Sequence, residues 1–150
     1  MSKIFIIASA ILLLPLSAQA AVDTACVAVE KHEISALFER WNTSLHTGDP
    51  ARVADNYSPD AVLLPTLSNI PRLDREGRLD YFTTFLAKKP SGSIDSRTIQ
   101  LGCNSATDTG VYTFTFNGQS PVVARYTFTY AWTGRQWLIN SHHSSAMPES

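Results

Sequence analysis

The chain has 150 residues, 44% of them hydrophobic, with 12 Lys and Arg against 13 Asp and Glu. This near-balanced charge, without a basic block, argues against nucleic acid and membrane surfaces as partners. The length fits one domain with one hydrophobic core, and no internal repeat or linker divides the chain.

The first twenty residues have the pattern of a secretory signal peptide. An apolar run follows Lys3, and a small-residue cleavage site ends at Ala20. The run is short for a membrane span, although an uncleaved anchor is the alternative. Cleavage after Ala20 leaves a single domain, residues 21–150, with 11 Lys and Arg against 13 Asp and Glu. We therefore expect a periplasmic or secreted protein without membrane attachment.

The two cysteines, Cys26 and Cys103, both lie in the part that would be exported. Disulfides form and persist in such compartments, so the even count predicts a bridge between them. Two buried free thiols are the alternative. Because the closed loop is long, the bridge would stabilise the fold by about 4 kcal/mol in the chain-entropy model.

Helical patterns occupy the first half of the domain. Apolar residues at three- and four-residue spacing predict a helix over residues 24–47. Asp49 and Asp74 are predicted caps of a short second helix and of a third helix, which Pro90 ends. A brief strand is expected at residues 61–64.

Alternating patterns occupy the second half. They predict strands at residues 97–101, 111–116, 122–132 and 137–145. Helices followed by an antiparallel meander define an α+β fold with the helices on one face of the sheet. Since one long helix cannot fill the hollow of a strongly curved sheet, such a fold tends to leave a pocket.

Several short motifs carry a family resemblance. Segments 33–50 and 56–62 are similar to the entry helix, its Gly-Asp turn and the step into the first strand of the nuclear transport factor 2-like (SnoaL-like) superfamily. The closing strand, with Trp137, His143 and Pro148, resembles that of the association (hub) domain of calcium/calmodulin-dependent protein kinase II. The resemblance implies a cone of about three N-terminal helices on a curved antiparallel sheet. No kinase domain is evident among these residues.

The resemblance also implies an oligomer with a pocket for a small organic ligand, which can be an anion. The hub lines its pocket with arginines, but Ser144 and Thr127 stand at two corresponding positions here. Arg125 lies two residues from Thr127, on the same sheet face, and is the candidate anchor. Arg97 and Arg72 are more distant candidates. An internal ion pair is the alternative role for Arg125.

The last strand supplies the other candidate ligand contacts. Alternation places Asn140, His142 and Ser144 on one face, and the hub comparison turns that face toward the pocket. His142 could act there as a general base or a hydrogen-bond donor. A structural histidine bonded to a neighbour is the alternative. Tyr57 and Tyr81 are further predicted lining residues.

An aromatic stripe follows the strand that carries Arg125. Tyr126, Phe128, Tyr130 and Trp132 fall on the face opposite Arg125. If Arg125 points inward, the stripe lies outside and predicts a homo-oligomer interface, because large exposed aromatic patches mark interfaces. Cover by a loop or by the N-terminal segment is the alternative.

No metal site or cofactor is expected. His142 and His143 are adjacent on a strand and point to opposite faces, and the spacing of His32 and His46 matches no ligand motif. A dinucleotide fingerprint is also missing from the sequence.

The sequence is compatible with two functions. The first is an exported oligomeric association-domain-like protein that binds a small molecule without obvious catalysis. The second is a cofactor-free enzyme of the SnoaL/SgcJ type, an isomerase, cyclase or oxidoreductase, in which His142 is the base and Arg125 stabilises developing negative charge.

Overall fold

The computed structural model describes residues 25–66 and 68–148. The predicted signal peptide, residues 1–20, lies outside them. The elements in chain order are α1 (Lys31–His46), α2 (Pro50–Ala54), β1 (Tyr57–Leu64), α3 (Arg75–Leu86), β2 (Ser91–Gly102), β3 (Ser105–Phe116), β4 (Gln119–Trp132) and β5 (Trp137–Ala146). The predicted order of helices followed by a meander is confirmed, and so is the α+β class.

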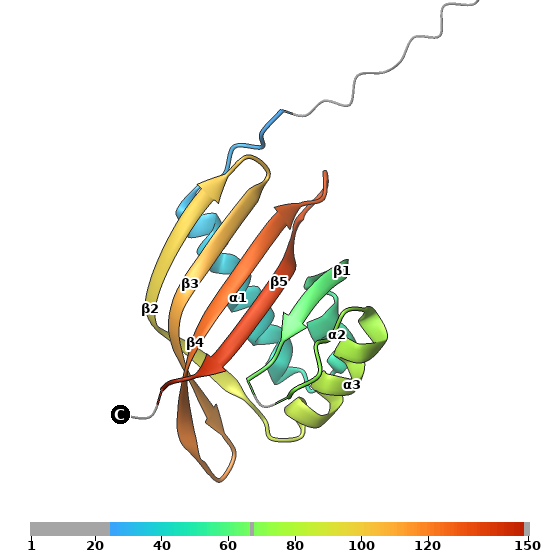
Figure 1. The fold of residues 1–150 in the computed structure, drawn as a ribbon, viewed down its shortest axis with the longest axis vertical. Coiled ribbons are helices and arrows are strands. Elements are labelled where there is room, and N and C mark those ends of the chain that lie inside the picture. The colour runs from blue at the N-terminus through green and yellow to red at the C-terminus, as the bar shows by residue number, and fades with distance from the viewer. Residues whose placement is uncertain (1–24, 67, 149–150) are drawn as a thin grey trace, which may run out of the picture.

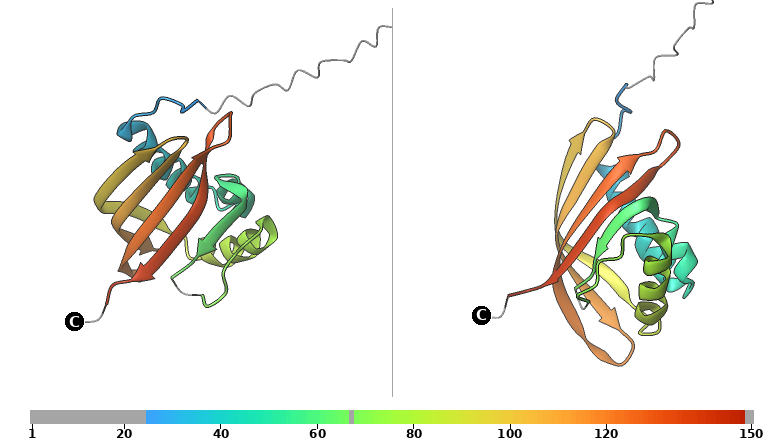
Figure 2. Two further views of the ribbon diagram at one scale, coloured as in Figure 1. Left: turned by 45° about the horizontal axis from the view of Figure 1, so that its top comes forward. Right: turned by 45° about the vertical axis from the view of Figure 1, so that its right-hand side comes forward.

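The strands form one curved, open sheet in the order β1-β5-β4-β3-β2 (Figure 1). Strands β2 to β5 pair antiparallel, whereas the edge strand β1 pairs in parallel with β5. The sheet is therefore mixed rather than purely antiparallel. The helices lie on one side of it, and its other face carries no described helix (Figure 2). Among the described residues, no helix combines the length and apolar character required to cross a bilayer.

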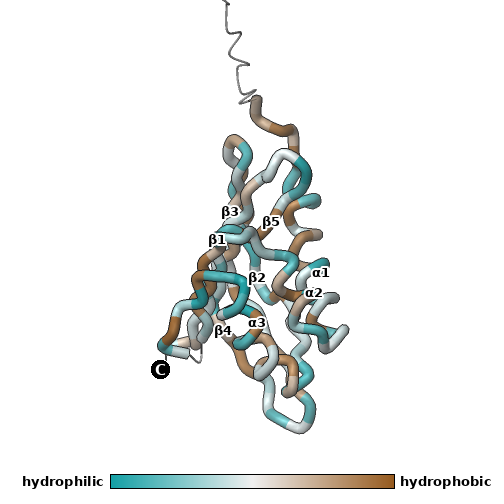
Figure 3. The backbone as a smooth tube through the Cα atoms, turned by 90° about the vertical axis from the view of Figure 1, so that its right-hand side faces the viewer, coloured by the Kyte–Doolittle hydropathy of each residue, from teal (hydrophilic) through white to brown (hydrophobic). Residues whose placement is uncertain are grey.

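Helix α1 begins later than the predicted residue 24. Its first turn is closed by a capping box, in which the backbone N–H of Glu30 donates to Glu33 Oε2 at 2.8 Å. Its buried apolar stripe, Ile34, Phe38, Trp41 and Leu45, lies in the core between helix and sheet. Seen edge-on, α1 and the strands form adjacent layers (Figure 3).

The two predicted caps are confirmed. Asp49 accepts a hydrogen bond from the backbone N–H of Ala51 at 2.9 Å, and Asp74 accepts one from Gly77 at 2.7 Å. A connection that the sequence did not reveal joins α3 to β1. The buried guanidinium of Arg78 donates to backbone carbonyl oxygens of β1, including that of Ala61 at 2.6 Å.

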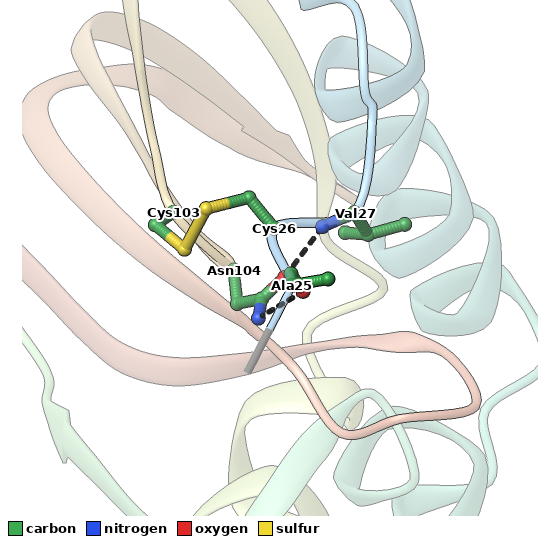
Figure 4. The surroundings of a disulfide bond; sticks show 5 residues. All are labelled: Ala25, Cys26, Val27, Cys103 and Asn104. Atoms are coloured by element: carbon green, nitrogen blue, oxygen red, sulfur yellow. Dashed lines mark hydrogen bonds between the residues drawn. A yellow bond between two sulfur atoms is a disulfide. The ribbon is translucent and has the colours of Figure 1, made fainter. Parts of the chain in front are cut away.

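The segment before α1, residues 25–30, forms no helix or strand and is tied to the turn between β2 and β3. Cys26 and Cys103 form the predicted disulfide (Figure 4). Next to it, the side chain of Asn104 accepts from the backbone N–H of Val27 at 2.8 Å and donates to the carbonyl of Ala25 at 3.2 Å. Asn104 has a positive φ of 54°, a conformation that Asn tolerates better than most residues. The clamp fixes the chain entry against one end of the sheet.

The aromatic stripe of β4 faces the helices, so its prediction as an exposed patch is wrong. Tyr126, Phe128 and Tyr130 are 3%, 0% and 0% exposed. Trp132 is half-buried and contacts Trp137, with 5.8 Å between ring centroids. Burying three large rings is favourable, whereas burying the charge of Arg125 would be costly, and Arg125 is exposed on the opposite face.

We call this opposite side of the sheet the outer face. Its central residues belong to β3, β4 and β5, and their side chains are mostly small, β-branched or hydroxylated: Thr109, Val111, Arg125, Thr127, Thr129 and His143. Any oligomer interface on the sheet must therefore use these residues instead of the aromatic stripe.

Candidate ligand pocket

A cavity of about 310 Å³ lies between α3, the loop after β1 and the concave side of the sheet. It is near the turn that joins β3 to β4. Aromatic side chains from α3 and β3 form most of its wall: Tyr81, Phe82, Phe85, Tyr112, Phe114 and Phe116. A hollow with few polar groups is typical of small-molecule sites.

His142 of β5 is fixed at the inner end of the cavity by a buried hydrogen-bond chain. Trp41 Nε1 donates to the hydroxyl of Tyr57 at 3.1 Å, and this hydroxyl lies 2.9 Å from His142 Nδ1. The imidazole also stacks on Phe128, with 3.9 Å between ring centroids. The ring therefore has neighbours on its face and at Nδ1 that prevent free rotation.

The other ring nitrogen, Nε2, is buried and has no hydrogen-bond partner among the described residues. Burial lowers the pKa of His142 to about 3, and the nearby His143 contributes to a smaller extent. His142 is therefore neutral near pH 7. A base whose pKa lies so far below the working pH removes protons poorly, so the site does not favour general-base catalysis.

A hydroxyl cluster lies two residues farther along β5. The hydroxyl of Tyr112 donates to Ser144 Oγ at 2.6 Å, and Thr66 Oγ1 lies 2.5 Å from the same oxygen. All three residues line the cavity. Together with His142, they are the main polar groups at its inner end.

Charged side chains also line the cavity. Arg72 Nη1 is 2.8 Å from Asp80 Oδ2, and its guanidinium lies over the ring of Tyr81 at 5.9 Å. The Arg72 side chain is only 17% exposed, and its Nε has no partner among the described residues. Lys88 adds a second cation. Burial raises the pKa of Tyr81 to about 12, so its hydroxyl stays protonated.

The structure brings together part of the predicted site. His142, Ser144 and Tyr81 line the cavity, while Tyr57 is buried behind His142. Arg125 and Asn140 are exposed and line no part of it, so their predicted places in the pocket are wrong.

The strand register explains both errors. Phe128 pairs with His142, so these side chains share a face, whereas Arg125 pairs with Ser145 on the other face. The β4–β5 ladder shifts between the pairs of Ser141 and Ile139, and this irregularity leaves Asn140 as an extra, exposed residue.

A second polar cluster, which sequence reasoning missed, occupies the core toward the disulfide end. Asp108 is 0% exposed and accepts hydrogen bonds from the hydroxyl of Tyr126 at 2.9 Å and from Arg97 Nε at 3.2 Å. The Arg97 guanidinium also lies over Phe38 at 5.6 Å. Arg97 is therefore the partner of an internal carboxylate rather than a ligand anchor.

Burial raises the pKa of Asp108, although the hydrogen bond from Tyr126 and the charge of Arg97 act against the shift. The signal in the sequence was an Asp at an inward position of a strand, since a buried carboxylate requires a nearby cation. Within residues 25–66 and 68–148, no group of three or more His, Cys, Asp and Glu side chains could hold a metal ion.

Comparisons with known proteins identify the family. Residues 30–148 match the family model of the calcium/calmodulin dependent protein kinase II association domain. A crystal structure described as such an association domain, from Xanthomonas campestris, is 50% identical in sequence, with a TM-score of 0.78; the match covers 92% of this chain and 100% of that one.

More distant structures share the fold. A nuclear transport factor 2-like superfamily protein of Salmonella enterica is 21% identical, with a TM-score of 0.67 over 80% of this chain and 92% of that one. An NTF2-like protein of Pseudomonas putida is 17% identical, with a TM-score of 0.70 over 79% and 87%. No curated protein matches the sequence significantly.

Proposed function

The chain belongs to the calcium/calmodulin dependent protein kinase II association domain family, and we propose that it is an exported, self-associating member that binds a small organic molecule. The proposal rests on the cavity of about 310 Å³, whose wall is mainly aromatic and whose lining includes His142, an imidazole with a buried nitrogen that has no hydrogen-bond partner in the described part of the chain. A cavity of this size accommodates a one-ring or two-ring molecule.

A ligand would place its apolar part against the rings of α3 and β3. If it carries a negative charge, Arg72 and Lys88 are the cations that line the cavity. Arg125 takes no part in this arrangement, because it lies on the outer face. Asp80 already neutralises part of the charge of Arg72, so the cavity accepts neutral ligands as well.

The enzymatic alternative receives less support from the geometry. It needs a base and a cation around one substrate, but His142 is neutral with its Nδ1 engaged, and Arg125 points away. The remaining polar groups at the inner end are hydroxyls in mutual hydrogen bonds. We therefore propose binding rather than turnover.

Self-association is proposed through the outer face. No described helix covers it (Figure 2), and apart from Arg125 its central residues carry no permanent charge. β-Branched side chains such as Thr127 and Val111 pack well between sheets.

Export is supported by two independent features. The sequence begins with a pattern typical of a signal peptide, and Cys26 and Cys103 form a disulfide. Structural disulfides belong mainly to oxidising compartments. Mass determination of the protein isolated from periplasmic extract tests this proposal, since cleavage after Ala20 gives a defined mass. A full-length chain that stays in the cytosol would contradict it.

Binding is tested by comparing two neighbouring valines of β4. Val122 lines the cavity and is 41% exposed, whereas Val123 is 44% exposed and is not part of the lining. Val122→Trp should obstruct the cavity, and Val123→Trp is the matched control. Titration of labelled protein with acetophenone and with phenylacetate, followed by NMR, should give shifts at Trp41 and Phe114 in the wild type. We expect Val122→Trp to weaken binding at least tenfold.

Equal affinity of both variants, or the absence of shifts at the cavity residues, would contradict the binding proposal.

Self-association is tested separately by sedimentation at micromolar concentration. Thr127→Arg on the outer face should dissociate the oligomer, while Thr43→Arg, on the exposed side of α1, should leave it intact. A monomeric wild type would exclude the oligomer.

A further inference from the structure

We propose that Trp41 and Tyr57 are positioning residues that fix one tautomer of His142, so that the cavity presents an N–H donor and selects ligands with a carbonyl-type acceptor. The choice of ligand class rests on the proposed function. The tautomer itself rests only on the buried hydrogen-bond chain and can be tested without a ligand.

The donor and acceptor roles along this hydrogen-bond chain follow from Trp41, the residue at its start. An indole N–H can only donate, so Trp41 Nε1 gives its hydrogen to the oxygen of Tyr57 at 3.1 Å. The hydroxyl hydrogen of Tyr57 must then find an acceptor. His142 Nδ1, at 2.9 Å, is the acceptor that the described residues supply.

The opposite tautomer of His142 would be incompatible with this order of donors and acceptors. If Nδ1 carried the proton, both Trp41 and His142 would donate to Tyr57, and the hydroxyl hydrogen of Tyr57 would be left in the core without an acceptor. Tyr57 is only 4% exposed, so water cannot easily compensate. Leaving a buried donor unpaired is unfavourable. Nδ1 is therefore the acceptor, and the single proton of the neutral ring lies on Nε2.

With the proton on Nε2, this atom is a hydrogen-bond donor, and no acceptor for it is found among the described residues. His142 lines the cavity, and Nε2 is buried without a partner among the described residues. An unpaired buried donor gains most from a ligand atom that accepts a hydrogen bond. A ligand amine or ammonium group, which brings only further donors, would leave it unpaired.

The hydroxyl cluster strengthens this preference. Tyr112, Ser144 and Thr66 carry three hydroxyl hydrogens and form two hydrogen bonds with one another, so one hydrogen of the Ser144–Thr66 pair remains available. His142 and Ser144 are alternate residues of β5 and therefore share a face. A carbonyl oxygen has two lone pairs and suits an inner end that offers donors.

The tautomer is tested directly by NMR of protein labelled with ¹⁵N in its histidine rings. Long-range proton–nitrogen correlations distinguish a protonated ring nitrogen from an acceptor nitrogen. In the wild type, we expect His142 Nε2 to give the protonated signature and Nδ1 the acceptor signature. Tyr57→Phe removes the hydrogen bond to Nδ1 and should give a mixture of tautomers.

Tyr130→Phe is the matched control. Tyr130 is buried, its hydroxyl has no partner among the described residues, and it does not line the cavity, so the signals of His142 should not change. Trp41→Phe is the second test variant if Tyr57→Phe does not fold, and it should also loosen the preference. A protonated Nδ1 in the wild type, or an unchanged tautomer in the variants that fold, would overturn the inference.

The ligand class is tested with two molecules of nearly identical shape, acetophenone and α-methylstyrene, which differ by a carbonyl oxygen in place of a methylene group. We expect wild-type protein to bind acetophenone about tenfold more tightly, and Tyr57→Phe to lose most of this preference. Equal affinities would overturn the acceptor assignment. Failure of both molecules to bind would count against the proposed function, whereas the tautomer is decided by the ring signals alone.

Discussion

The two ends of the concave side of the sheet differ in whether their buried polar groups have hydrogen-bond partners among the described residues. Toward the β2–β3 turn, Asp108 is paired with Arg97 and Tyr126, and the disulfide clamps the chain entry nearby. Toward the β3–β4 turn, the cavity is lined by His142 and Arg72, and each has a buried side-chain nitrogen without a hydrogen-bond partner among the described residues.

We infer that residues important for stability and residues available for binding lie at different ends of the fold. At the disulfide end, the stripe of α1 and the rings of β4 fill the space, so that a carboxylate must be satisfied internally. At the other end, α3, the loop after β1 and the sheet enclose a hollow. Substitutions at the first end should change mainly stability, and substitutions at the second mainly binding.

The largest effect is expected for the disulfide. Replacement of Cys26 and Cys103 by Ser should lower the free energy of unfolding by about 4 kcal/mol, because the denatured chain regains the freedom of a long loop. Urea denaturation with and without reductant measures the change. Affinity for acetophenone under native conditions should remain the same. A parallel loss of affinity would show that the disulfide end also affects binding.

The next effect concerns the buried ion pair. Asp108→Asn should lower the free energy of unfolding by about 3 kcal/mol, since it leaves Arg97 near the core without its counter-charge. Urea denaturation again provides the measurement. The double variant Arg97→Met/Asp108→Leu should recover part of the loss. If the single variant is as stable as the wild type, this cluster does not stabilise the disulfide end.

His142 should make stability depend on pH. The unfolded imidazole gains its proton near pH 6.5, but the folded one does so only at about pH 3. Between these values the unfolded state binds more protons, so His142 lowers stability by about 1.4 kcal/mol for each unit that the pH falls. Denaturation curves from pH 7 to pH 4 should show a shallower dependence in His142→Asn, which keeps an acceptor for Tyr57.

The exposed neighbour provides the control for this measurement. His143→Asn should keep most of the pH dependence of the wild type, because burial is the larger cause of the lowered pKa of His142 and the charge of His143 the smaller one. Identical curves for both variants would show that burial of His142 is not the cause.

The smallest effect concerns charge in the cavity. Arg72→Gln should weaken binding of phenylacetate about fivefold and leave that of acetophenone nearly unchanged, because only the first ligand is charged. Arg75→Gln, an exposed residue of the same region paired with Asp55, should change neither affinity. Isothermal titration measures both, and equal losses for the two ligands would exclude an electrostatic role for Arg72.

Much of the fold could be predicted because it depends on local signals. The caps Asp49 and Asp74, the change from helical to alternating periodicity, and the pairing of Cys26 with Cys103 are each encoded in nearby residues or in a simple count. The late start of α1 was not predictable in the same way, since the disulfide and Asn104 tie the preceding residues to the turn between β2 and β3.

The candidate site was only partly predictable because it depends on strand register. The burial of Phe128 together with His142 requires their pairing across β4 and β5, and alternation within one strand cannot give this. The irregularity at Asn140 is a tertiary feature of the same kind. Tyr126 and Tyr130 were predicted to be exposed because Arg125 was assigned to the interior. Three aromatic rings on the other face of the strand gain more from burial than one arginine does.

The most direct test of the cavity at the β3–β4 end is a crystal structure of the protein soaked with 4-bromoacetophenone. We expect an anomalous bromine peak near the rings of Phe85 and Phe114, with the ketone oxygen about 3 Å from His142 Nε2. A cavity without bromine at saturating ligand, or a ketone turned away from His142 toward Lys88, would exclude this binding mode.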